Sequence, residues 1–352
     1  MMPGHFRSLE TPALCLDLTA LQQRIDEVAQ LIDDCGKLWR PCADWHLLPQ
    51  ISMLQCAAGA SGIALDSINQ AQRFIDAGVS SLHLSRPPAV ATLLQQQFRD
   101  QPQLEISIAC DHYIQAEALS RIGSEVGRRI PVLLELNAGR HRSGVRPGLD
   151  GRDLARGASR LPGIEIRGIE TSLGTLGPGE IARAESATGM LSELKQHLIR
   201  DGICCETVSV SAEGDLTPLL KCEAITELRT GNFFTGTLDT SSPLSVIATI
   251  FSRSKLERAV LDVGRAHLGS RESEQLRIRR TALGRPLPDA SITQVGWGSL
   301  TLELGSASRD IMIGDQVEVE LLDGTLALRL FPKILVWRNG VPVDTWTAAP
   351  PR

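Results

Sequence analysis

The feature that most constrains the fold is an alternation of short β-rich runs with amphipathic helical segments between residues 20 and 240. Eight runs have strand character: Leu38–Pro41, Gly62–Leu65, Ser81–Leu84, Glu105–Ala109, Pro131–Leu136, Ile164–Ile169, Thr207–Val210 and Ile225–Leu228. Apolar residues three and four positions apart predict helices at Leu21–Asp34, Ile68–Ala77, Ile114–Ser120 and Ala182–Arg200. Eight βα units in about 220 residues favour an α/β fold, a TIM (β/α)8 barrel, over an open doubly wound sheet.

The pattern changes after residue 240 to alternating runs with turn signals and no long helical period. Six runs are predicted strands: Ser245–Phe251, Ala259–Asp262, Gln294–Leu304, Gln316–Leu321, Thr325–Leu330 and Ile334–Arg338. Asp323-Gly324 and Asn339-Gly340 have the composition of hairpin turns. The sequence therefore predicts a barrel over residues 15–240, and a C-terminal β domain over residues 241–352 that also includes residues 1–14.

Composition narrows the partners and the compartment. The chain has 36 basic and 41 acidic residues without any basic cluster, which argues against nucleic acid as a partner. Eight cysteines without a CxxC pair argue against a zinc ribbon or a disulfide scaffold and favour a reducing compartment. No run of 18 apolar residues occurs, and Arg7 and Glu10 fall where a signal peptide would need an apolar core. We therefore expect a cytoplasmic protein without a membrane partner.

In a barrel, the residues that follow each strand form the active face, so polar residues at these places are the candidate site. The richest segment is Glu135–Val145, which contains Arg140-His141-Arg142. The candidates from the other strand ends are Cys42, Asp44, His46, Ser172, Glu213, Arg229 and Gly231.

The order of these segments, together with the trailing β domain, resembles the fold-type III, alanine-racemase-like pyridoxal-phosphate enzymes, specifically the D-threonine aldolase and D-serine dehydratase family. The opening Glu10–Leu18 is similar to that family's Thr-Pro-Ala-x-x-x-Asp. The most specific match is Leu133–Val145, which resembles Glu-x-(Asp)-x-Gly-x-x-Arg-x-Gly-Val. Further matches are Arg40-Pro41, Gly62–Val79, Ser209–Ser211 with Thr217-Pro218, Glu227–Phe233 and Leu261–Gly264.

The resemblance implies an imine between pyridoxal phosphate and a lysine at the end of the first barrel strand, in a run like Arg-Pro-His-x-Lys-Thr-His. The corresponding run here is Arg40–His46, and the lysine position is Asp44, which cannot form an imine. The nearest lysine in the sequence, Lys37, lies at the other end of the same strand. We therefore expect no pyridoxal phosphate to be used as a cofactor.

Two further groups of family residues differ in this chain. The implied metal ligands, a His and a Cys of the β domain, fall at Gly296–Gly298 and Asp323–Thr325, so we expect no zinc. The implied phosphate loop becomes Ser211–Thr217, where Glu213 and Asp215 replace backbone donors with acidic side chains. The alternative for these two acids is ordinary capping of a helix over Leu216–Cys222.

The residues allow several roles. Asp44 and His46 are candidate catalytic acid and base groups, or else a hydrogen-bonded loop. Cys42 is a candidate nucleophile if His46 activates it. Arg142 is a candidate carboxylate-binding residue, and otherwise braces loops. Ser172, Glu213, Arg229 and Gly231 complete the predicted substrate pocket.

Three functions stay open. The first is a cofactor-independent acid/base enzyme, a lyase or isomerase, acting on a small amino, hydroxy or keto acid. The second is a pseudoenzyme that binds a ligand or a partner protein. The third is a pyridoxal-phosphate lyase acting on a D-amino acid, which Asp44 disfavours. The resemblance further implies a homodimer.

Overall fold

The computed structural model describes residues 9–89, 91–138, 140, 142–177, 179–232, 242–269 and 275–348. Its contacts divide the chain into two compact units. We call Asp26–Gly231 the barrel unit, and the described residues before Asp26 and after Gly231 the β unit. Among the described residues, no helix is long and apolar enough to cross a bilayer.

The barrel unit contains a parallel sheet in the strand order β2-β9-β8-β7-β6-β5-β4-β3. The strands are β2 (Leu38–Trp39), β3 (Ile63–Leu65), β4 (Ser81–Leu84), β5 (Glu105–Cys110), β6 (Ile130–Glu135), β7 (Ile164–Leu176), β8 (Thr207–Gly214) and β9 (Glu227–Arg229). A parallel bridge between Cys42 and Ala64 joins the two ends of this order, and the Ala64 N–H donates to the Pro41 carbonyl over 2.8 Å. The sheet therefore closes on itself, which confirms the predicted barrel.

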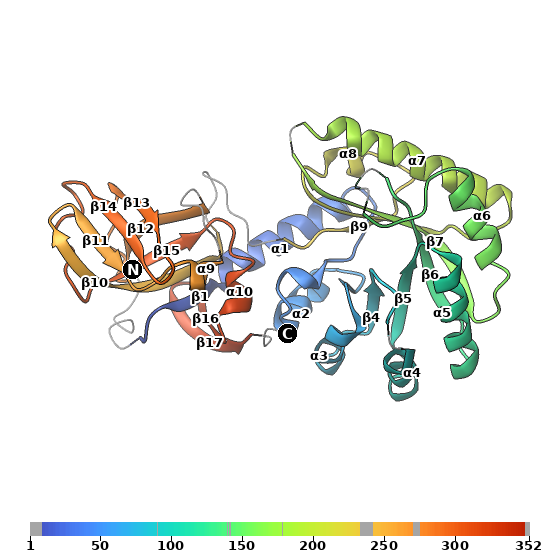
Figure 1. The fold of residues 1–352 in the computed structure, drawn as a ribbon, viewed down its shortest axis with the longest axis horizontal. Coiled ribbons are helices and arrows are strands. Elements are labelled where there is room, and N and C mark those ends of the chain that lie inside the picture. Colours follow the sequence, from blue (N-terminus) through green and yellow to red (C-terminus); the bar gives the residue numbers. More distant parts are fainter. Residues whose placement is uncertain are drawn as a thin grey trace. The chain divides into compact units, whose positions relative to one another are not determined.

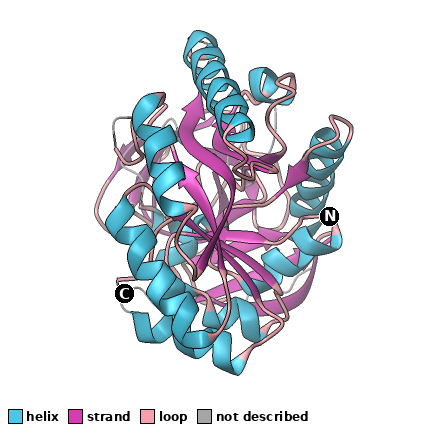
Figure 2. Ribbon diagram, turned by 90° about the vertical axis from the view of Figure 1, so that its right-hand side faces the viewer, coloured by secondary structure: helices cyan, strands magenta, loops and turns pink. Residues whose placement is uncertain are grey.

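Helices surround these strands, which lie at the centre in Figure 2. In chain order, the helical segments are α1 (Leu18–Asp33), η2 (Ala43–Trp45), α2 (Pro49–Ala57), η3 (Ile68–Gln70), α3 (Gln72–Asp76), α4 (Ala91–Asp100), α5 (Tyr113–Val126), α6 (Leu149–Ala158), α7 (Ile181–Arg200) and α8 (Thr217–Leu220). Local sequence determines both ends of α5. The His112 side chain caps α5 by accepting from the Ile114 N–H, and Gly127 ends α5 in the left-handed region at φ 68°.

The β unit is a mixed, mostly antiparallel sheet in the order β13-β14-β11-β10-β1-β16-β17, with β15 pairing β10 and β12 (Figure 1). Its strands are β1 (Ala13–Asp17), β10 (Leu244–Lys255), β11 (Arg258–Leu261), β12 (Leu276–Thr281), β13 (Ala290–Val295), β14 (Leu300–Leu304), β15 (Gln316–Leu321), β16 (Lys333–Arg338) and β17 (Val341–Thr347). Strand β1 is central, since it pairs antiparallel with β10 and parallel with β16.

Several predictions for the β unit need correction. The predicted barrel start at residue 15 falls inside β1, and the β unit extends to Ile25. The run Gln294–Leu304 is two strands separated by a turn. Thr325–Leu330 is not a strand, because it contains the short helix α10 (Ala327–Leu330). Asn339-Gly340 is a hairpin turn as predicted, with φ of 52° and 77°.

Candidate active site

Several charged and polar side chains lie in the barrel interior. Successive residues of a strand face opposite sides, so Glu227 and Arg229 of β9 face inward while Leu228 faces the helices. The same alternation places His83 of β4 and Glu170 of β7 inside the barrel, where both side chains are buried. Buried charged groups from several strands therefore meet inside the barrel.

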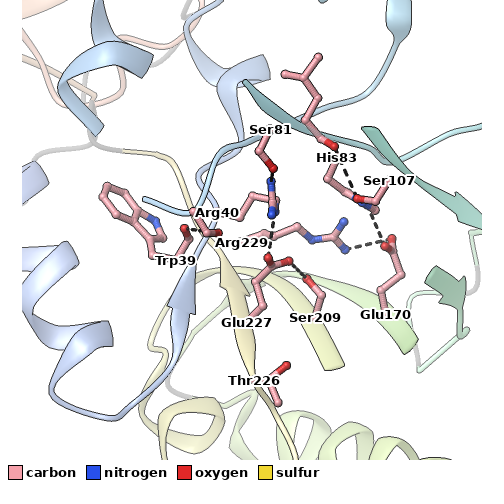
Figure 3. Close-up of polar contacts among 12 residues, drawn as sticks. Trp39, Arg40, Ser81, His83, Ser107, Glu170, Ser209, Thr226, Glu227 and Arg229 are labelled. Carbon is pink, nitrogen blue, oxygen red and sulfur yellow. Dashed lines mark hydrogen bonds and ion pairs between the residues drawn. The ribbon is translucent and has the colours of Figure 1, made fainter. Parts of the chain in front are cut away.

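One chain of contacts crosses the interior (Figure 3). Arg229 Nη2 donates to Glu170 Oε1 over 3.0 Å, and His83 Nε2 lies 2.8 Å from Glu170 Oε2. His83 Nδ1 lies 3.0 Å from the Ser107 hydroxyl. Because Nε2 contacts a carboxylate, we assign its ring proton to Nε2 and the acceptor role to Nδ1.

The charge states of Glu170, His83 and Arg229 follow from these contacts. Burial by itself would raise the pKa of Glu170, but Arg229 and His83 outweigh burial and lower it to about 2. Burial lowers the pKa of His83, which favours the neutral ring. Burial opposes the charge of Arg229, but Glu170 outweighs it and raises the guanidinium pKa. The interior therefore holds one buried ion pair with a neutral histidine beside it.

A second group of contacts involves Glu227. Its Oε2 accepts from Arg40 Nε over 2.8 Å and its Oε1 accepts from the Ser209 hydroxyl over 2.7 Å. Arg40 Nη1 also donates to the Ser81 hydroxyl over 3.1 Å (Figure 3). Gly62 makes room for this arginine, because a Cβ there would lie 2.5 Å from Arg40 Nη1. These hydrogen bonds link β9 with β8, with the end of β2 and, through Arg40, with β4.

Asp44 and His46 lie in and just after η2, at the C-terminal end of β2. Asp44 Oδ2 accepts from the Asp66 N–H over 2.8 Å, which ties this loop to the end of β3. His46 is only 1% exposed, and its Nδ1 accepts from the Leu48 N–H over 2.9 Å. Each side chain therefore accepts a hydrogen bond from a nearby backbone N–H group.

Cys42 lies close to several of the predicted residues, among them Gly231 and Arg229. Its Sγ is 3.8 Å from the Ser211 hydroxyl, and its backbone carbonyl would lie 2.6 Å from a Cβ at Gly231. Burial raises the pKa of the thiol to about 12, although the nearby Arg229 opposes this. A thiol with this pKa is protonated at neutral pH, which argues against Cys42 as a nucleophile.

Glu213 and Gly231 meet at the ends of β8 and β9. Glu213 Oε1 accepts from the Gly231 N–H over 2.9 Å, and Oε2 accepts from the Thr230 hydroxyl over 2.7 Å. Glu213 does not cap α8. Instead, Asp215 Oδ1 accepts from the Thr217 N–H at the start of this helix over 2.9 Å. One of the two acids is therefore an ordinary capping group and the other is not.

The Glu135–Val145 segment folds back over the end of β6. Glu135 Oε1 accepts from the Ser143 hydroxyl over 2.7 Å, and Asp111 Oδ2 accepts from the Gly144 N–H over 2.8 Å. Gly144 is required here, since its φ is 99° and a Cβ would lie 2.4 Å from the Asn137 nitrogen. Burial raises the pKa of Glu135. This carboxyl belongs to the segment predicted from the sequence, and its raised pKa makes it an acid/base candidate.

The remaining predicted residues lie nearer the surface. Arg142 is exposed, and no hydrogen bond or ion pair joins it to the rest of the described chain. Ser172 accepts from Arg140 Nη1 over 3.3 Å. His141, between the two arginines, lies outside the described residues.

Glu170 is one of the polar residues that the sequence places at the end of a barrel strand, but the sequence analysis assigned it no role and did not find its partners His83 and Ser107. The available signal was polar residues inside buried strands, at positions where helix-facing neighbours are apolar. No group of three or more His, Cys, Asp or Glu side chains within the described ranges is arranged to hold a metal ion.

The fold, with its candidate site at the C-terminal ends of the barrel strands, defines an alanine-racemase-like barrel protein. Residues 16–239 match the family "Alanine racemase, N-terminal domain", and the chain belongs to this family. A D-threonine aldolase from Arthrobacter sp. is 26% identical over 96% of this chain and 92% of its own length. A D-threo-3-hydroxyaspartate dehydratase from Delftia sp. (strain HT23) is 29% identical over 65% of this chain and 62% of its own length.

Solved structures agree on the fold. The crystal structure of D-threonine aldolase from Filomicrobium marinum superposes with a TM-score of 0.84 at 22% identity, over 97% of this chain and 96% of that one. Alanine racemase from Bacillus anthracis superposes with a TM-score of 0.71 at 12% identity, over 96% of this chain and 98% of that one.

Proposed function

We propose that this chain works without pyridoxal phosphate, and that the C-terminal end of its barrel binds a small amino, hydroxy or keto acid. The names of the relatives, D-threonine aldolase and D-threo-3-hydroxyaspartate dehydratase, suggest hydroxy amino acids as the first ligands to test. Catalysis at this site would be acid/base chemistry on the bound acid.

The residues present do not fit the cofactor. Asp44 stands at the implied imine position, and its carboxylate is held by the Asp66 N–H. In the barrel unit, Lys37 Nζ donates to the Cys222 and Ile225 carbonyls over 2.8 Å each, and Lys195 Nζ donates to the Ala224 carbonyl over 3.2 Å. These carbonyls precede β9, so these two amines are held at the N-terminal end of the barrel. The third lysine of this unit, Lys221, is exposed at the end of α8.

The observation that carries acid binding is the state of Arg229. Its side chain is fully buried and pairs with Glu170 through Nη2, while Nε and Nη1 have no hydrogen-bond partner among the described residues. Buried N–H donors left unpaired are costly, and a ligand oxygen would satisfy them. Arg142, exposed on the loop beyond β6, is the candidate for the ligand carboxylate.

The residues that would transfer a proton are chosen by their position at the strand ends. Asp44 and His46 remain the sequence-based candidates, and Glu135 joins them because its partly buried carboxyl has a raised pKa and is near Glu170 and Arg229. Since Asp44 and His46 each accept a backbone N–H, a non-catalytic binding protein is the second candidate function.

A thermal-shift screen of amino, hydroxy and keto acids, including D-threonine and D-threo-3-hydroxyaspartate, tests the proposal. We expect ligand-induced stabilisation that is lost in Arg142→Ala and kept in Arg160→Ala, an exposed arginine that follows α6. Stabilisation that survives Arg142→Ala would remove this residue from the site.

Turnover of the best ligand separates the two candidate functions. In the enzyme, Asp44→Asn or Glu135→Gln should abolish turnover while ligand binding persists. Binding without turnover in the unmodified protein identifies the non-catalytic role. A pyridoxal absorbance band that borohydride fixes to a lysine would overturn the cofactor-free proposal.

A further inference from the structure

The ends of β8 and β9 form a small set of oxyanion donors. The Gly231 N–H and the Thr230 hydroxyl both point at one carboxylate, that of Glu213, over 2.9 and 2.7 Å. Gly231 is buried against Cys42, and a Cβ there would lie 2.6 Å from the Cys42 carbonyl oxygen. The backbone can approach this point only because residue 231 has no side chain.

The occupant of these donors belongs to the chain itself. Both oxygens of Glu213 are engaged, each by a different donor, so the carboxylate is bound as an external oxyanion would be. An anion from solution must displace a carboxylate that the neighbouring strand β8 holds beside these donors, at a high effective concentration. It must also approach a negative charge.

We propose that Glu213 is a built-in anion that fills a latent phosphate site and so excludes phosphorylated ligands from this end of the barrel. The inference rests on the contacts of Glu213 and does not require the acid ligand proposed above. It assigns Glu213 a specificity role: ligands that carry a phosphate group are rejected at this end of the barrel.

Removing the carboxylate should expose the site. We expect Glu213→Ala to bind inorganic phosphate at least about tenfold more tightly than the unmodified protein, a change that corresponds to about 1.4 kcal/mol. Titration calorimetry at constant ionic strength measures this affinity, and the melting temperature of Glu213→Ala should rise with phosphate. Glu213→Gln keeps the volume and removes the charge, so it should show a smaller gain.

Two controls isolate the site. Asp215→Ala makes the same change two residues away, at a carboxylate that caps Thr217, and should bring no phosphate binding. Adding Thr230→Val to Glu213→Ala removes one donor and should reverse most of the gain.

The outcomes decide between the alternatives. A folded Glu213→Ala that binds phosphate no better than Asp215→Ala overturns the proposal. If Glu213→Ala does not fold, a folded Glu213→Gln without any gain does the same. Phosphate binding by the unmodified protein as tight as that of the variants would also overturn it. None of these results depends on whether the unmodified protein stabilises with amino or hydroxy acids.

Discussion

At the scale of single residues, the molecule depends on a buried ion pair whose partners are far apart in sequence. Glu170 and Arg229 are each about 2% exposed and contact each other over 3.0 Å. Removing one partner of such a pair leaves the other charge buried without compensation. We expect Glu170→Gln to lower the free energy of unfolding by about 3–5 kcal/mol. Urea denaturation measures this, with the half-buried Glu165→Gln as the control, and a loss as small as the control's would contradict the assignment.

The same carboxylate gives a pH dependence. Its pKa is about 2 in the folded chain and is expected near 4.5 in the unfolded chain, so the unfolded state binds more protons between these values. Stability from this group is complete above about pH 4.5 and is lost as the pH falls towards 2. Urea midpoints should therefore fall more steeply over this window in the unmodified protein than in Glu170→Gln. Equal slopes would count against the pair.

The sequence alone located some of these residues and not others. Asp44, Glu213 and Arg229 were predicted because they follow strands, and strand ends in a barrel share one face. The partners of these residues could not be predicted, because contacts such as Arg229 with Glu170 depend on the stagger of strands around the closed sheet.

At the scale of elements, glycines have opposite roles in a strand end and in a helix. A Cβ at Gly231 would lie 2.6 Å from a Cys42 backbone atom, whereas a Cβ at Gly189 in α7 would meet nothing within 4 Å. We expect Gly231→Ala to destabilise the protein, even when combined with Cys42→Ala, because the contact is with backbone. Gly189→Ala should stabilise it by about 0.5–1 kcal/mol. Thermal unfolding of both variants measures this, and equal effects would refute the argument.

Element prediction succeeded where the signal was local. The eight barrel strands have apolar runs and turn boundaries of their own, and all eight are observed. Strand β1 has no such context, since its pairing with β10 and β16 depends on residues more than 200 positions away. Thr325–Leu330 has a strand-like alternation, but Asp323 Oδ1 accepts from the Thr325 N–H in a turn that leads into α10.

At the scale of the whole molecule, the barrel unit is an insertion within the β unit. The segment before Asp26 supplies β1, and the segment after Gly231 supplies the strands that flank it. Leu16 of β1 is completely buried, so Leu16→Ala should cost about 2–5 kcal/mol of stability. Leu149 is 74% exposed, and Leu149→Ala should stay within about 0.5 kcal/mol. Denaturant unfolding of both variants tests this, and a small effect at Leu16 would contradict the central place of β1.

The place of β1 also sets an order of events during synthesis. Strand β16, its parallel neighbour, is translated some 320 residues later, a delay on the order of tens of seconds at ribosomal rates. The intervening barrel segment has its own strands and core, so it can fold while β1 waits with both hydrogen-bonding edges open. Until β10 is translated, some 230 residues after β1, the nascent chain carries an apolar, unpaired strand, Leu14-Cys15-Leu16, which is a segment that a chaperone would protect.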